Sequence, residues 1–289
     1  MSMPILPPQV LRYAPWSISK ADTLERCPSQ FHYRYVLKEK EARKGTQALV
    51  GVSAHAIQEF ALLRQPTHEV LVSYAQEQME QDGLTGAEKT EVAGKLPGIS
   101  DFVKNIQAIK AAYGVRRELI EHKLAMNAQL EGCDFNDPTR LIRGVLDYGL
   151  DTSSGVFLLI DHKSGKRKPI QQHSVQFYVY MAMIIANYPE VLGVQSAINY
   201  FGAPELDWFP TFSGHQGPWT REDIVRHVHP WLVRYLSKLA KPLTVIDAGA
   251  PTPVTGWQCD YCGYVDHCPQ GTLHVEERRQ KKSSKQSGV

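Results

Sequence analysis

Two strand-length segments joined by a tight turn constrain this chain more than any other feature of its sequence. The first, Leu141 to Leu150, is rich in β-branched and apolar residues. Ser153-Ser154-Gly155 supplies a turn, and Val156 to Ile160 is an apolar run of strand length. The sequence therefore predicts a β-hairpin near the middle of the chain.

Charged side chains lie at the edge of this predicted hairpin. Asp161 and Lys163 end its second strand, and because side chains alternate along a strand they share one face while His162 points away. Pairing across the turn brings Asp147 to the same edge. Two carboxylates and an ammonium then converge, a set that can hold Mg²⁺ or Mn²⁺ beside a phosphate. The alternative is a strand that ends in an exposed turn, because so short a motif recurs by chance.

Helical patterns surround the predicted strands. An N-cap at Ser19 begins a helix that runs to Val36, and a second helix covers Ala48 to Leu63. After Gly114 the pattern changes to strands. These are expected at Leu119–Met126, Leu141–Leu150, Val156–Ile160, Val191–Phe201 and Asp207–Phe212, with helices at Ile170–Ala186 and Arg221–Leu239. A helical lead, a short mixed sheet and later helices predict an α/β or α+β fold.

Length and composition exclude several classes of protein. The 289 residues, 43% hydrophobic and 21% charged, allow one large domain or two small ones and argue against a disordered or coiled-coil chain. No apolar run approaches the ~20 residues of a membrane span. The beginning of the chain lacks a basic region followed by an apolar run, so a cytoplasmic location is expected. Residues 274–289 are basic and polar, and are predicted to be disordered, serving as a solubilising end or a weak hold on nucleic acid.

The five cysteines are clustered rather than scattered. Cys259 and Cys262 form a CxxC, and Cys268 follows with five residues between. In a chain expected to be cytoplasmic, this spacing favours a metal over disulfides. Taken alone, this C-terminal cluster indicates a site in which three thiolates, with His267 or His274, bind Zn²⁺.

Five short motifs occur in one order along the chain. They are Ser17-Ile18-Ser19 with Cys27-Pro28 and Tyr33, Gly51 to His55, Gly144 to Asp147, Asp161 to Gly165, and Gln176 to Tyr180. In this order the chain resembles the PD-(D/E)XK nuclease superfamily. More specifically, it resembles the RecB-type branch, which includes the CRISPR-associated iron–sulfur exonucleases and the AddB nuclease domain.

The resemblance implies a restriction-endonuclease-like core, a short mixed β-sheet flanked by helices. Residues 17–273 would form a single nuclease domain after an irregular segment at 1–16. Its parts would be a helical region at 17–113, the catalytic sheet at 114–215, and a C-terminal helix with a cysteine cluster at 216–273.

The resemblance also assigns roles to residues. It makes His55, Asp147, Asp161 and the carbonyl of His162 ligands of one or two Mg²⁺ or Mn²⁺ ions, and Lys163 the residue that positions the attacking water. It makes Gln176 and Tyr180 residues that orient this lysine and the DNA backbone. Glu121 could support a second metal, although Glu118 is an alternative because the register of its strand is not fixed by sequence.

For the cysteines the resemblance implies a 4Fe–4S cluster. The layout of one cysteine before the core and three after it is matched by Cys27, Cys259, Cys262 and Cys268. Structural Zn²⁺ stays the alternative, and Cys133 is left over.

The function that follows is a metal-dependent DNA exonuclease acting on single strands or free ends, in recombination, repair or phage or CRISPR DNA processing. A protein partner, such as a recombinase, a helicase or a CRISPR adaptation component, is possible. The alternative is a non-catalytic module that binds DNA ends or a partner and carries a structural Fe–S or zinc site.

Overall fold

The computed structural model describes residues 6–42, 46–203, 205–249 and 251–286. These residues form two compact units, each with its own internal contacts. The first unit is continuous over 46–234, and the second combines 5–45 with 235–289. The expected single domain over 17–273 stays a prediction, whereas the expected mixed α/β architecture is confirmed.

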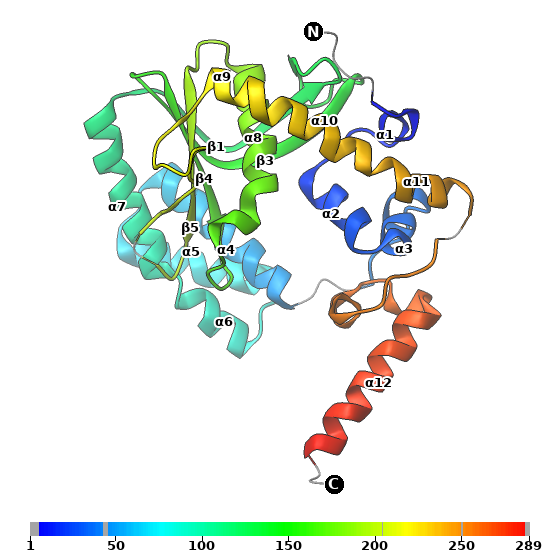
Figure 1. Ribbon diagram of the computed structural model, residues 1–289. Helices are drawn as coiled ribbons and strands as arrows, with labels where there is room; N and C mark the ends of the chain where they lie inside the picture. The colour runs from blue at the N-terminus through cyan, green and yellow to red at the C-terminus, as the bar shows by residue number, and fades with distance from the viewer. Residues whose placement is uncertain (1–5, 43–45, 204, 250, 287–289) are drawn as a thin grey trace. The chain divides into compact units, whose positions relative to one another are not determined.

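A mixed sheet forms the centre of the first unit (Figure 1). Its strand order is β2-β1-β3-β4-β5-β6, with β7 also paired to β5. Only β4 and β5 are parallel, and the other pairs are antiparallel. The strands are β1 (Val115–Asn127), β2 (Gly132–Cys133), β3 (Arg140–Thr152), β4 (Val156–Lys163), β5 (Gly193–Tyr200), β6 (Asp207–Trp208) and β7 (Trp219–Thr220). The predicted hairpin is thus β3–β4, whereas the strand expected at Asp207–Phe212 is only two residues long.

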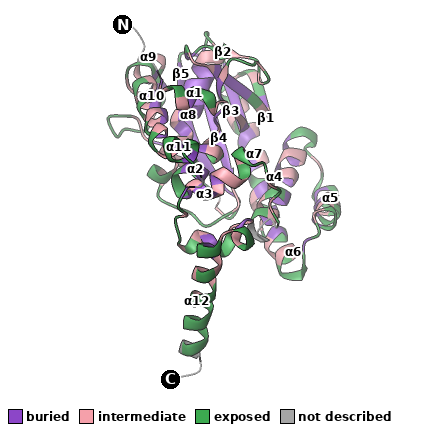
Figure 2. Ribbon diagram, turned by 90° about the vertical axis from the view of Figure 1, so that its right-hand side faces the viewer, coloured by how far each residue is buried: buried purple, intermediate pink, exposed green. Residues whose placement is uncertain are grey.

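Helices cover the sheet and bury its apolar side chains. On α7 (Leu96–Tyr113), Phe102 and Ile106 pack with Tyr148 of β3 and Ile160 of β4. The helix α8 (Ser174–Asn187) makes the crossover between the parallel strands β4 and β5 and contacts β1, β3 and β5. Figure 2 shows the buried residues concentrated in the strands.

Three further helices pack beside α7. They are α4 (Thr46–Arg64), α5 (His68–Gln81) and α6 (Gly86–Ala93), and their apolar faces share a core with Ile99 of α7 and Phe201. Thr67 caps α5, and a capping box of Thr85 and Glu88 begins α6. This layer matters because α4 carries His55. The unit ends with α9 (Arg221–Asp223), a π-helical turn at Ile224–Val228 and the start of α10 (His229–Lys238).

The second unit brings the two ends of the sequence together. From the N-terminal side it contains α1 (Pro8–Arg12), α2 (Ile18–Arg26), α3 (Pro28–Phe31) and a π-helical turn at His32–Val36. From the C-terminal side it contains α11 (Ala240–Asp247), the 3₁₀ turns η4 (Trp257–Tyr261) and η5 (Val265–His267), and α12 (Pro269–Gln286).

The first helix differs from its prediction in two ways. The N-cap is Ser17, whose hydroxyl accepts a hydrogen bond from Lys20 N–H, and not Ser19. The helix also stops at Cys27, because the following Pro28 disfavours a helical conformation at the residue before it. Part of the segment expected to be irregular is the short helix α1.

The basic tail also differs from its prediction, because α12 continues through 274–286. Glu, Arg, Gln and Lys are good helix formers, and neither Gly nor Pro interrupts residues 272–286. The start of the helix is anchored, since Thr272 Oγ1 donates to the Val265 carbonyl at 2.8 Å and Arg278 pairs with Asp260 at 3.0 Å. The last three residues of the predicted tail lie outside the described residues. None of the helices in the described part of the chain has the length and apolar character needed to cross a membrane.

Candidate active site

Three carboxylates align across neighbouring strands of the sheet. The antiparallel register pairs Tyr148 with Ile160, so Asp147 and Asp161 face one another one residue further along β3 and β4. On the other side of β3, Ile120 pairs with Tyr148 and His122 with Leu146, which places Glu121 opposite Asp147. Asp147 is therefore the middle member of a row that crosses β1, β3 and β4.

Glu121 has an unusual backbone conformation within β1. Its φ is 47°, in the left-handed region that non-glycine residues rarely adopt. Such a conformation costs roughly 1–3 kcal/mol and tends to persist where the surroundings require it, often at functional sites. Glu118 is engaged elsewhere, since it accepts a hydrogen bond of 2.8 Å from Tyr148 Oη and pairs with Lys110 at 2.5 Å. The structure thus places Glu121, and not Glu118, beside Asp147.

A histidine from the helical layer completes a group of metal-ligand type. The ligand atoms of His55, Glu121 and Asp147 all lie within 4.8 Å of one another. His55 Nδ1 is 3.8 Å from Asp147 Oδ2. One turn earlier on α4, Gly51 passes close to Ser164, since a Cβ there would lie 3.4 Å from Ser164 Oγ. This close approach sets α4 against the end of β4.

Asp161 is held by different partners. Its Oδ2 lies 2.6 Å from Lys163 Nζ, and its Oδ1 accepts a hydrogen bond from the side-chain amide of Gln176. Tyr180, one turn further along α8, donates its hydroxyl hydrogen to the Val145 carbonyl at 2.5 Å. Gln176 thus contacts Asp161, which is itself paired with Lys163, and Tyr180 contacts β3. Their expected roles in orienting the lysine and the DNA backbone stay predictions.

His162 faces away from the carboxylates, as the alternation of the strand predicts. Its buried ring contacts Phe102 at a centroid distance of 4.8 Å, and its Nδ1 lies 3.0 Å from Asn199 Nδ2. Burial lowers the pKa of His162 well below its ordinary value, so the ring is neutral. Its backbone N–H donates to Asp147 Oδ2 at 2.8 Å.

The electrostatics of the row favour a bound cation. Burial, reinforced by the charge of Asp161, raises the pKa of Asp147 well above its ordinary value. Burial, together with Glu59 and Asp161, raises the pKa of Glu121 to about 7. Burial lowers the pKa of His55, which leaves the neutral imidazole that metals bind. Two mutually repelling carboxylates beside a neutral imidazole fit a divalent cation such as Mg²⁺ or Mn²⁺.

The basic segment after β4 is partly neutralised. Arg167 pairs with Asp207 through two nitrogen atoms, whereas exposed Lys166 and Lys168 form no ion pair with another described residue. The sequence interpretation missed a contact beside this segment. Tyr200 Oη accepts the Lys168 N–H at 3.0 Å and lies 3.1 Å from His173 Nε2.

Aromatic side chains can stack on unpaired bases, but three candidates in this chain differ in their surroundings. Trp219 is only 2% exposed, packs against Phe209 and donates its indole N–H to the Pro210 carbonyl, so it belongs to the core. Trp208 is half-buried and Tyr33 stacks on Tyr264.

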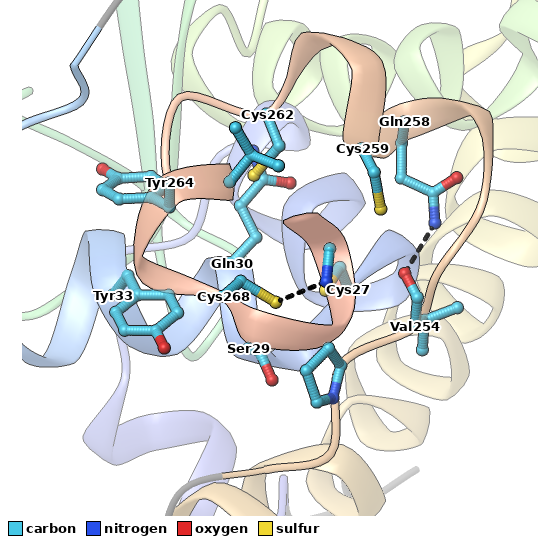
Figure 3. Close-up of a pocket in the computed structure, with 13 residues that line it drawn as sticks. Cys27, Ser29, Gln30, Tyr33, Val254, Gln258, Cys259, Cys262, Tyr264 and Cys268 are labelled. Carbon is cyan, nitrogen blue, oxygen red and sulfur yellow. Dashed lines mark hydrogen bonds between the residues drawn. The ribbon is translucent and has the colours of Figure 1, made fainter. Parts of the chain in front are cut away.

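Four cysteines come together in the second unit. Cys27 ends α2, and the other three lie in and around η4 and η5. Figure 3 shows the four thiols lining one cavity, and Cys133 is not among the residues around it. They are Cys27, Cys259, Cys262 and Cys268.

The four thiols could hold either metal that the sequence allows. A tetrahedral zinc site uses four ligands with Zn–S bonds of about 2.3 Å, and a 4Fe–4S cluster is likewise held by four thiolates. Burial raises the pKa of the Cys262 thiol, so a bound cation is needed to stabilise its thiolate form.

Comparisons with known proteins identify the family of this chain. No curated protein matched the chain. Among solved structures, the chain is similar to one titled "Crystal structure of SSO0001", with 14% identity and a TM-score of 0.33 over 88% of this chain and 97% of the other. The model of the PD-(D/E)XK nuclease superfamily matches residues 15–269, which contain every residue of the carboxylate row and all four clustered cysteines. The chain therefore belongs to the PD-(D/E)XK nuclease superfamily, whose members use divalent metals.

Proposed function

We propose that this protein is a metal-dependent DNA exonuclease that hydrolyses phosphodiester bonds in single strands or at DNA ends, and that it belongs to the RecB-type iron–sulfur branch of its superfamily. One observation carries the catalytic part of the proposal. The carboxylates of Glu121, Asp147 and Asp161 meet His55 and Lys163 at one edge of the sheet.

The residues divide into those that bind metal and those that handle the substrate. A Mg²⁺ or Mn²⁺ ion held by His55, Glu121 and Asp147 would activate water and stabilise charge on the phosphate. Asp161, fixed by Gln176, would complete the ligand set from the opposite side of Asp147. The carbonyl of His162, expected as a further ligand by family resemblance, remains part of the proposal.

Lys163 lies where its ammonium could contact the phosphate of a substrate. Its ammonium pairs with Asp161 and is about one-third exposed, so it can reach a substrate beside the carboxylates. There it would orient the attacking water and offset negative charge that develops in the transition state. The unpaired Lys166 and Lys168 nearby would contact the DNA backbone.

The proposed 4Fe–4S cluster rests on the cysteine cavity. Four thiols from distant parts of the sequence line it, and four thiolates are the ligand set of a 4Fe–4S cluster. The cluster would link the N-terminal and C-terminal segments of the second unit and contribute to its folding.

A cleavage assay tests the catalytic proposal. Linear and circular single strands and blunt duplex DNA, all labelled, are incubated with Mn²⁺ and the wild type, Asp161→Ala, Lys163→Ala or the control Asp101→Ala. Asp101 is an exposed acid of α7. The proposal predicts that the wild type and the control degrade linear DNA from its ends, whereas the two site variants do not.

Other outcomes separate the alternatives. Cutting of the circle at the same rate as the linear strand would replace exonuclease with endonuclease activity. Equal cleavage by all four proteins would overturn the site. Tight end binding without cleavage in any metal would instead favour the non-catalytic module.

A further inference from the structure

Two aromatic rings stand exposed on either side of a buried cysteine in the second unit. Trp257 is 64% exposed and Tyr261 is 67% exposed, whereas Cys259 between them is 8% exposed. Both aromatic residues belong to η4, where a rise of about 2 Å per residue separates them by about 8 Å along the axis. Neither ring stacks on another ring of the described chain.

Hydrogen bonds fix the turn that presents these rings. Gln258 Nε2 donates to the Val254 carbonyl at 2.9 Å, and the Cys259 N–H donates to Gly256 at 3.0 Å. The Cys262 N–H in turn donates to the Cys259 carbonyl at 3.3 Å. Because these hydrogen bonds already order the turn, the protein loses little conformational entropy when a ligand stacks on the rings.

A basic helix begins beside the turn. Arg278 of α12 pairs with Asp260 of η4 at 3.0 Å, and Asp260 directly precedes Tyr261 in the sequence. Lys281 and Lys282 follow at positions i+3 and i+4, so they share this side of the helix. Both are exposed, and neither forms an ion pair within the described part of the chain, while the acidic pair Glu276 and Glu277 precedes Arg278.

We propose that Trp257, Tyr261 and this basic side of α12 form a binding site for single-stranded DNA, distinct from the carboxylate row. Unpaired bases would stack on the two rings, and the lysines would contact phosphates. A single strand offers base faces and phosphates together, whereas a duplex covers its base faces. This inference rests on the proposed function, because it names the form of DNA that the nuclease holds.

The test measures binding without cleavage. Fluorescence anisotropy of a labelled oligothymidylate of about 16 nucleotides is followed in EDTA with the full-length protein. We expect Trp257→Ala and Tyr261→Ala each to weaken binding by about 10-fold, and Trp257→Phe to retain most of the affinity. Phe212→Ala is the matched control, because Phe212 is 69% exposed but lies in the first unit.

Salt dependence tests the basic side of the site. Replacing both Lys281 and Lys282 by Gln should lower the slope of log Kd against log salt concentration by about 1.4, the value for two contacts to a single strand. Circular dichroism verifies that each variant is folded. Affinities of the two aromatic variants equal to that of Phe212→Ala would overturn the proposal, as would an equal loss of affinity for a blunt duplex.

A small substrate separates this inference from the proposed function. Hydrolysis of bis(p-nitrophenyl) phosphate with Mn²⁺ reports on the carboxylate row alone, since the compound has no bases to stack. Trp257→Ala should leave that rate unchanged. If the wild type hydrolyses nothing but Trp257→Ala still weakens DNA binding, the nuclease proposal fails and the single-strand site stands. A loss of hydrolysis in folded Trp257→Ala would contradict a separate site.

Discussion

The carboxylate of Asp147 accepts a hydrogen bond of 2.8 Å from the backbone N–H of His162. The regular pairing of β3 with β4 ends at Tyr148 and Ile160, so this contact joins the two strands just beyond their ladder. It also directs one carboxylate oxygen of Asp147 toward β4, where Asp161 lies. The Asp147 side chain therefore stabilises the hairpin and also belongs to the candidate active site.

Substitution of Asp147 separates these two roles. Asp147→Asn keeps an acceptor oxygen for His162 but removes a charge that is costly when buried, so the metal-free variant should unfold at the same temperature as the wild type or higher. Asp147→Ala leaves the His162 N–H without its partner and should cost about 1–3 kcal/mol. Both should lower Mn²⁺-dependent cleavage at least about 100-fold. Thermal unfolding in EDTA checks the contrast, and equal destabilisation by Asn and Ala would contradict it.

The raised pKa of Glu121 predicts how stability depends on pH. The folded protein holds a proton up to a pKa of about 7, whereas the unfolded chain releases it near the ordinary value of 4.5. Because the native state binds more protons in this window, the free energy of unfolding should decrease as pH rises through it. Glu121→Gln should flatten this dependence and stabilise the metal-free protein by roughly 1–2 kcal/mol above pH 7, after allowance for solvent screening.

Urea unfolding in EDTA across this range measures the effect, with Glu118→Gln as the control on the same strand. Added Mn²⁺ should reverse the trend, because metal binding requires the ionised carboxylate and so strengthens as pH rises. The free energy of unfolding in EDTA could instead increase with pH, with the same slope in the wild type and in Glu121→Gln. That result would rule out the proposed environment of Glu121.

Lys163 and Lys166 form a matched pair of cations. Lys163 pairs with Asp161 at 2.6 Å, whereas exposed Lys166 has no ion-pair partner among the described residues. Lys163→Met should lower kcat about 10²–10⁴-fold while Mn²⁺ binding is retained. Lys166→Met should raise KM for DNA and leave kcat unchanged. Steady-state cleavage and Mn²⁺ titration provide the readouts, and equal kcat losses in both variants would refute a specific role for Lys163.

A glycine contact holds α7 against the end of β5. A Cβ on Gly98 would lie 1.8 Å from the carbonyl oxygen of Phe201, whose ring stacks 5.7 Å from that of His162. Gly98→Ala should therefore destabilise the protein by about 3 kcal/mol or more, because helix or strand must move. Gly86→Ala is the control, since a Cβ there meets nothing within 4 Å. Urea denaturation compares them, and similar stabilities would mean that the contact is easily relieved.

The hairpin and its charged edge could be predicted because local signals agree there. Apolar alternation, a Ser-Ser-Gly turn and the period of a strand place Asp161 and Lys163 on one face without knowledge of the rest of the chain. Glu121 could not be assigned in this way. Its position opposite Asp147 depends on the register of β1 against β3, which the sequence does not fix, and no glycine marks the left-handed backbone conformation at this residue. The hydrogen-bond partners of Gln176 and Tyr180 could not be predicted either, because helical spacing predicts a shared face but not the partner of each side chain.

The C-terminal segment shows where local sequence is least informative. Polar composition predicts a disordered tail, yet the anchoring of Thr272 and Arg278 on the cysteine-bearing turns continues α12 to Gln286. Composition reports the average tendency of a segment to be ordered. It does not reveal that a few tertiary contacts at the start of the segment can stabilise a helix. The grouping of Cys27 with cysteines more than 200 residues later likewise came from the resemblance, since spacing alone allowed a local zinc site.

The cysteine cavity gives the last prediction. Cys27→Ser removes one of its four thiols, whereas Cys133→Ser removes the cysteine that lies outside it. Protein purified without oxygen should be brown and contain iron and sulfide. Cys27→Ser should lose most of this iron and unfold at a lower temperature, because a bound metal contributes to the stability of the segments that it joins. Cys133→Ser should match the wild type in both respects. Metal analysis that finds zinc in a colourless wild type would establish a zinc site instead, and equal iron in the two variants would exclude the cavity as the site of the cluster.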